Sequence, residues 1–304
     1  MKLSDYWQNF ELLKEIEVAG GFIYDGLRAL HEIEYLHHET EIFSVLYNLS
    51  VGLERLIKVS IILLEYEDGI DPIQFEKTLI THNHSELISR VQKQQNLRLG
   101  KAHNEFLSLL AKFYKSYRYD RYSLDTVKEL SKEKEALISF LDKHIELEFS
   151  SNILGDSFVS NTRKTKKFIG KLVRKVVDEI YSVIRNESYR KNIYTYEVRS
   201  KSKAYKFILG DDVDFSLEDI LWKELLIFLL SYKGKSDHLD FIKSFDPLNF
   251  DIAMLREYLD AVKNDVDKIG LIDELEYLYE DVENKSERFE RLKYMNAKDV
   301  FFDS

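Results

Sequence analysis

The sequence predicts a mostly α-helical protein, with an N-terminal helical bundle and a C-terminal helical region that carries one β-hairpin. Only two prolines and eleven glycines interrupt the 304 residues, and both residue types are unfavourable inside helices. Apolar residues recur at spacings of three and four over long segments, which is the pattern of a helix with one buried face. Apolar and polar residues alternate convincingly only at residues 193–209, and this period is that of a β-strand.

Residues 1–150 are predicted to form the bundle. Gly20 and Gly21 should separate its first two helices, and Asp71–Pro72 fits a helix start because proline is favoured in the first helical turn. The central segment has a wide apolar face, as expected of a helix that is surrounded by others. The expected helices cover residues 6–18, 22–37, 43–64, 102–119 and 131–148.

Residues 151–304 are predicted to form a second region. The polar segment 152–162 separates an acidic half from a basic segment and suggests the boundary. A helix over residues 165–185 should carry apolar side chains on one face and cations on the opposite face. The alternating residues 193–209 are predicted to form the hairpin and to pack against this helix.

The last third of the chain is predicted to be helical. Ser216, with Asp219 three residues later, has the pattern of a capping box at the start of a helix that ends near Tyr232. Apolar residues in heptad spacing over residues 252–292 predict either an αα-hairpin or a long helix kinked at Gly270.

Composition limits the function. The absence of cysteine excludes disulfides and thiolate metal sites, and it fits a reducing compartment. No leader-like segment is recognisable, so a cytoplasmic location is expected. The net charge of −10 argues against wrapping a long DNA duplex, yet residues 163–206 contain fourteen Lys or Arg against four acids.

Three short motifs lie in the first half of the chain. They are Glu54-x-x-x-Lys58, the His-containing segment Thr81–Leu87, and Tyr114-x-x-x-Arg118-Tyr119. In their order and rough spacing they resemble the HEPN family of small prokaryotic helical domains. In this chain Leu87 lies three residues after His84, where the family usually has two, and Asp120 replaces a proline that often follows the Arg-Tyr pair.

The resemblance implies a helical bundle that is usually a homodimer. Members of the family include RNA-cleaving toxins of toxin-antitoxin systems, proteins of antiviral defence, and non-catalytic nucleic-acid or nucleotide-binding modules. We therefore expect an RNA-directed protein. Its expected activity is that of a metal-independent endoribonuclease, and a neutralising or regulatory protein is its expected partner. The alternative is a non-catalytic nucleic-acid-binding or dimeric scaffold protein.

Catalytic members of the family use an Arg that is followed four to six residues later by a His. Arg98 and His103 have this spacing. In RNA cleavage the His would move a proton and the Arg would stabilise charge on the phosphate. The other interpretation of the pair is two exposed side chains at a helix start.

Four cations, Lys164, Lys167, Lys171 and Arg174, lie on the polar face of the predicted helix 165–185 and are candidates for nucleic-acid binding. Arg118, among tyrosines, could stack on a base or hold a carboxylate. Both sets are also compatible with a solvated or structural role. No cofactor or metal is expected, since the paired histidines point in different directions on a helix.

Overall fold

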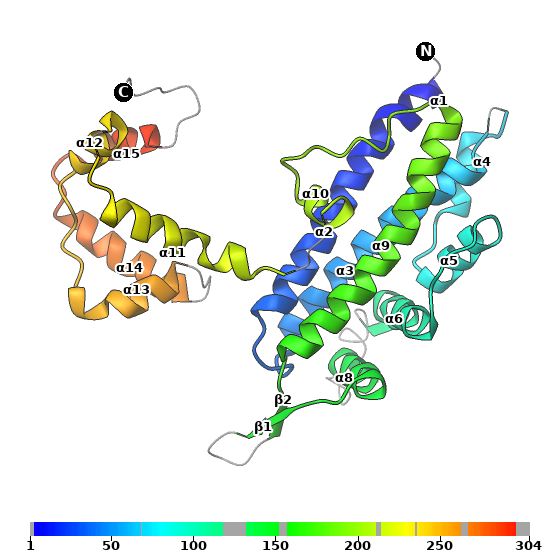
Figure 1. Ribbon diagram of the computed structural model, residues 1–304, viewed down its shortest axis with the longest axis horizontal. Helices are drawn as coiled ribbons and strands as arrows, with labels where there is room; N and C mark the ends of the chain where they lie inside the picture. Colours follow the sequence, from blue (N-terminus) through cyan, green and yellow to red (C-terminus); the bar gives the residue numbers. More distant parts are fainter. Residues whose placement is uncertain are drawn as a thin grey trace. The chain divides into compact units, whose positions relative to one another are not determined.

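The computed structural model divides the chain into two compact units, Met1–Ile220 and Leu221–Ser304 (Figure 1). The expected boundary at residues 150 and 151 falls inside the first unit, where α9 packs against α3 on the other side of that boundary. The structure describes residues 3–67, 69–117, 132–151, 157–210, 214–234, 236–262 and 267–295.

The first unit is built almost entirely from helices. Its elements are α1 (Leu3–Tyr6), the π-helical turn Trp7–Glu11, α2 (Leu12–Glu32), α3 (Glu39–Glu65), α4 (Pro72–Thr78), α5 (His84–Gln92), α6 (Lys101–Lys112), the π-helical turn Phe113–Tyr117, α8 (Lys132–His144), β1 (Phe149–Ser151), β2 (Ser157–Val159), α9 (Arg163–Lys191), α10 (Lys203–Ile208) and the start of α11 (Ser216–Ser231). The predicted fold class, mostly α with one β-hairpin, is confirmed.

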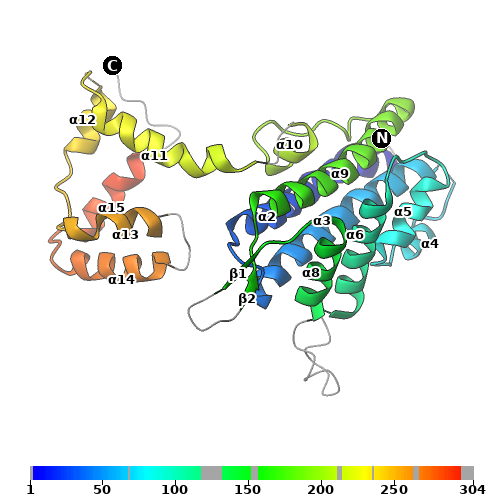
Figure 2. The same ribbon diagram turned by 60° about the horizontal axis from the view of Figure 1, so that its bottom comes forward.

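Helix α3 is the centre of this unit. It contacts α2, α5, α6, α8 and α9, and these helices surround it in both views (Figures 1 and 2). Leu53, Leu56 and Ile57 are completely buried, as expected of a helix that packs on several sides. The central helix predicted at residues 43–64 is therefore confirmed.

Helix α2 runs without a break through Gly20 and Gly21, so the prediction of two separate helices was wrong. A Cβ atom on Gly20 would lie 2.3 Å from the Cβ atom of Ala204. Gly20 thus serves the close approach of α10 to α2, and the hydrogen bonds of the helix continue across it.

The β-hairpin lies elsewhere than predicted. Strands β1 and β2 pair antiparallel, with Phe149 opposite Val159. Residues 193–209 form tight turns followed by α10, which Ser202 caps by accepting a hydrogen bond from the Tyr205 N–H. The hairpin prediction for that segment was wrong because α10 packs on α2 and α9 and buries Ala204 and Phe207, whereas Tyr194 and Tyr205 are exposed.

The second unit contains the remainder of α11, α12 (Asp237–Lys243), a 3-10 turn (Ile252–Met254), α13 (Leu255–Ala261), α14 (Asp267–Glu280) and α15 (Lys285–Tyr294). Gly270 lies inside α14 and does not separate two helices as expected. The α13–α14 contact includes a 2.5 Å hydrogen bond from the Tyr258 hydroxyl to Glu274. No described helix in either unit combines the length and apolar character needed to cross a membrane.

Candidate anion-binding site

A pocket of about 590 Å³ opens between α2, the first half of α9 and the start of α11. Leu27, Leu30 and Phe215 contribute apolar surface. The other lining residues are His31, Arg163, Lys166, Lys167, Gly170, Lys171, Arg174, Asp214 and Ser216. The pocket therefore combines an apolar part with an unusual concentration of cations.

The cations reach the pocket because α9 is amphipathic. Thr162 begins the helix by accepting a hydrogen bond from the Thr165 N–H at 3.4 Å. Residues such as Val173, Val176 and Ile180 are completely buried on one face. The pocket-lining residues of α9 follow one another at alternating spacings of three and one positions, so they share the opposite face.

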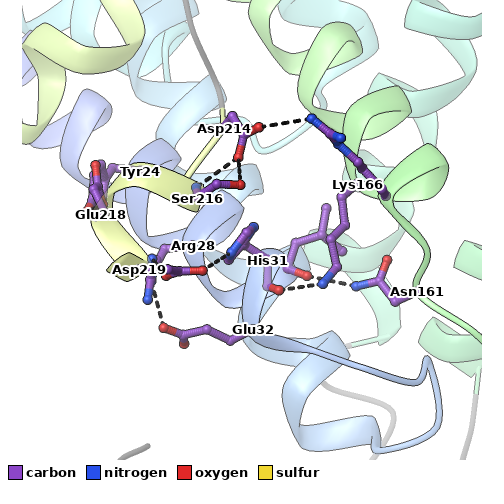
Figure 3. A network of polar contacts seen from close by, with 12 residues as sticks. Tyr24, Arg28, His31, Glu32, Asn161, Lys166, Asp214, Ser216, Glu218 and Asp219 are labelled. Atoms are coloured by element: carbon purple, nitrogen blue, oxygen red, sulfur yellow. Dashed lines mark hydrogen bonds and ion pairs between the residues drawn. The ribbon is translucent and has the colours of Figure 1, made fainter. Parts of the chain in front are cut away.

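The C-terminal end of α2 is held by two polar side chains (Figure 3). The Asn161 amide donates to the carbonyl oxygens of Leu30 and Ile33 at 2.7 and 3.0 Å. The Lys166 ammonium donates to the carbonyl oxygen of His31 at 2.6 Å. Carbonyls at a helix end lack partners within the helix, so these contacts satisfy them and position His31. Burial lowers the pKa of Lys166.

The first turn of α11 is anchored to α2 by ion pairs (Figure 3). Asp219 accepts from Arg28 Nη1 at 2.8 Å and contacts His31 Nε2 at 2.6 Å. Glu218 accepts from the Tyr24 hydroxyl at 2.6 Å, and burial together with this carboxylate raises the pKa of Tyr24 to about 12. These contacts bring His31 beside a carboxylate that lies 188 residues away in the sequence.

Asp214 replaces the predicted capping box at the start of α11. Its carboxylate accepts from the Ser216 N–H at 2.8 Å and from the Ser216 hydroxyl at 2.5 Å, and these hydrogen bonds lower the pKa of Asp214. Arg163 approaches the same carboxylate at 3.6 Å. The capping function thus belongs to Asp214, since Ser216 is already the first residue of the helix.

The pocket carries a net positive charge. Five of its lining residues, Arg163, Lys166, Lys167, Lys171 and Arg174, are cationic, whereas Asp214 is its one carboxylate. Within the described part of the chain, no carboxylate forms an ion pair with Lys167 or Lys171, and both side chains are exposed. Cations gathered in this way attract anions.

The four predicted nucleic-acid-binding residues of α9 divide into three groups. Lys167 and Lys171 line the pocket with exposed side chains. Arg174 lines it too, yet it donates to the carbonyl oxygens of Phe207 and Gly210 and pairs with Asp178 at 2.9 Å. This guanidinium holds α10 in place.

Lys164 lies outside the pocket lining, and its Nζ atom is 3.9 Å from Glu146 Oε2. The predicted contact residue Arg118 lies outside the described residues.

Sequence reasoning did not select His31, Arg163, Lys166 or Asp214 as site residues. Arg163 and Lys166 belong to the same cationic cluster as Lys167, so the helical period alone was sufficient to include them. Nothing in the sequence connects His31 and Asp214 with α9, because these segments meet only in the folded chain.

The predicted catalytic pair lies beside another face of α9. The Arg98 N–H donates to Glu179 at 2.8 Å, and Glu179 also pairs with Lys175. His103 Nδ1 accepts from the Gly100 N–H at 3.1 Å, and burial lowers the pKa of His103. The proton of its neutral ring is therefore on Nε2.

Among the described residues, no three His, Cys, Asp or Glu side chains gather as a metal site would require.

Comparison with protein-family models, with curated proteins and with solved structures gives no match. The site is therefore characterised by its own geometry, which is that of a cationic, partly apolar pocket suited to an anionic ligand.

Proposed function

We propose that this protein binds RNA, and that the pocket between α2, α9 and α11 holds RNA phosphates. The supporting observation is the excess of five cations over one carboxylate in the pocket lining. Like charges held close together repel one another, and a phosphate removes this repulsion while accepting charge-assisted hydrogen bonds.

A short or single-stranded RNA segment fits this pocket better than a long duplex. The chain as a whole carries a charge of −10, so a ligand that covers much of its surface would meet repulsion. A pocket of about 590 Å³ can receive only a small part of a nucleic acid. The apolar lining from Leu27, Leu30 and Phe215 is compatible with a base beside the phosphates.

The HEPN resemblance supports the choice of RNA. It rests on Glu54-x-x-x-Lys58, the His-containing segment 81–87 and Tyr114-x-x-x-Arg118-Tyr119, which agree with the family in order and rough spacing. On this basis we further propose that the protein is a homodimer and acts in a toxin-antitoxin or defence setting, with a neutralising protein partner. The alternative is a non-catalytic nucleic-acid-binding or dimeric scaffold protein.

RNA affinity can be measured by fluorescence anisotropy with a labelled single-stranded RNA. The double variant Lys167→Glu/Lys171→Glu should bind at least about tenfold more weakly. Its negative slope of log affinity against log salt should become less steep by about 1.4, because two phosphate contacts are lost. Lys164→Glu is the matched control, since it reverses a charge on the same helix outside the pocket. Unchanged affinity of the double variant would contradict the proposal.

Cleavage of the bound RNA is the second part of the proposal. Arg98 and His103 remain the pair predicted from the sequence, and the Arg98 N–H donates to Glu179 of α9. Incubation of the purified protein with RNA in the presence of a chelator tests metal-independent cleavage. Intact RNA under conditions of saturated binding would favour the non-catalytic alternative.

A further inference from the structure

His31 differs from the other residues of the pocket lining in carrying an imidazole, of which each ring nitrogen can donate or accept a hydrogen bond. Its Nε2 atom lies 2.6 Å from Asp219 Oδ2, and the Arg28 guanidinium holds the second oxygen of the same carboxylate at 2.8 Å. A carboxylate paired with a guanidinium is an acceptor only. His31 therefore donates from Nε2, and the lone pair of the neutral ring is on Nδ1.

We propose that His31 is the general base of an RNA-cleaving centre inside the cationic pocket, with Asp219 as its positioning residue. This inference rests on the proposed binding of RNA in the same pocket. A histidine oriented by a carboxylate through one ring nitrogen, with the other nitrogen able to accept a proton, is the arrangement that activates hydroxyl nucleophiles in many enzymes.

The surroundings of His31 support a catalytic role. Its ring is tilted against Phe215 with centroids 5.4 Å apart, and its backbone carbonyl is held by Lys166, so the side chain has a defined position. The side chain remains 23% exposed and lines the pocket. Lys167 and Lys171 on the same pocket lining provide positive charge for the phosphate.

The reaction balances with RNA and water alone. His31 Nδ1 takes the proton of a ribose 2′-hydroxyl, and the 2′-oxygen forms a bond to the adjacent phosphorus. The bond from phosphorus to the 5′-oxygen breaks, and this oxygen takes a proton from water. The products are a 2′,3′-cyclic phosphate and a 5′-hydroxyl, and His31 returns its proton to solvent.

His103 is less suited to the role of base. Its Nδ1 lone pair already accepts the Gly100 N–H, and Nε2 of the neutral ring carries the proton. His144 offers a matched comparison because its Nε2 atom lies 2.7 Å from Glu105. This second histidine–carboxylate pair is absent from the lining of the cationic pocket.

The test compares wild type with His31→Gln, His144→Gln and His103→Ala in cleaving a labelled single-stranded RNA with chelator present. The side-chain amide introduced by His31→Gln can still donate to Asp219, so anchoring of α11 should persist, and thermal unfolding checks this. We expect His31→Gln to lower the cleavage rate at least about 100-fold with RNA affinity unchanged, and His144→Gln to match wild type. The all-deoxy oligonucleotide should remain intact because it lacks the 2′-hydroxyl.

A further readout separates catalysis from structure. Wild-type cleavage should give one product that ends in a 2′,3′-cyclic phosphate and one that begins with a 5′-hydroxyl. Full cleavage by His31→Gln, or loss of cleavage in His103→Ala alone, would overturn the inference while leaving RNA binding intact. Tight RNA binding without any wild-type cleavage would also overturn it, whereas failure to bind RNA would refute the proposed function as well.

Discussion

The Nε2 atom of His84 lies 2.8 Å from the carbonyl oxygen of Ser50, and the side chains of both residues are completely buried. This contact joins the first residue of α5 to the middle of α3. Burial lowers the pKa of His84, so the folded protein holds this imidazole in its neutral form. A buried neutral histidine makes the stability of the bundle depend on pH.

We predict that the stability contribution of His84 is lost as the pH falls below about 6.5, the ordinary histidine value. The unfolded chain then binds a proton at this position that the folded chain does not, so the free energy of unfolding decreases with decreasing pH. Urea unfolding at pH values of about 7.5 and 5.5, on either side of that value, measures the loss. His84→Gln should show a smaller difference between the two pH values, and an equal difference would contradict the assignment.

Gly20 and Gly21 should respond in opposite directions to the same substitution. Gly20→Ala places a Cβ atom 2.3 Å from the Cβ atom of Ala204 and should destabilise the protein by about 1–3 kcal/mol through overpacking. Gly21→Ala meets nothing within 4 Å and should stabilise it by about 0.5–1 kcal/mol through helix propensity. Urea unfolding of both variants gives the two free energies, and equal signs would refute the account of how α10 packs on α2.

Asn161→Ala should cost about 2–3 kcal/mol, since the carbonyl oxygens of Leu30 and Ile33 would lose the donor that satisfies them in a buried place. Asn104→Ala is the control, because its amide contacts the Gly100 carbonyl at 3.2 Å in an exposed position. Thermal unfolding monitored by circular dichroism compares the two. A similar midpoint for both variants would show that the end of α2 does not depend on Asn161.

Homodimerisation in solution is predicted from the family resemblance, with the N-terminal bundle as the expected interface. Helix α11 offers a second surface, since Leu225 and Phe228 are 52% and 55% exposed. Large exposed apolar surfaces are typical of interfaces. Sedimentation at micromolar concentration should therefore give a dimer.

The substitution Phe228→Asp locates the interface. Dissociation of this variant assigns the interface to α11, and an intact dimer leaves it with the bundle. Ile80→Asp, at a position that is 79% exposed in the first unit, controls for a general effect of adding charge. A wild-type monomer would contradict the prediction of dimerisation.

Local patterns of the sequence determined the elements that have long regular periods. Apolar spacing of three and four predicted the central helix over residues 43–64 and the amphipathic helix that became α9, because burial of one helical face needs such spacing. The same pattern placed Lys167 and Lys171 on the polar face. Asp71 was correctly associated with a helix start, and its side chain accepts from the Ile73 N–H.

Tertiary structure alone decided the features that depend on distant contacts. Residues 193–209 have the period of a strand, yet they form turns and α10 because α2 and α9 offer them a surface to pack against. The sequence alone suggests that a helix ends at Gly20, whereas in the folded chain this glycine allows the close approach of Ala204. The pocket brings α2 and the start of α11 together, and the Asp219 carboxylate there contacts Arg28 and His31, which are 191 and 188 residues away in the sequence. Periodicity reports which face of an element is buried, whereas the partner that buries it is set by packing of the entire chain.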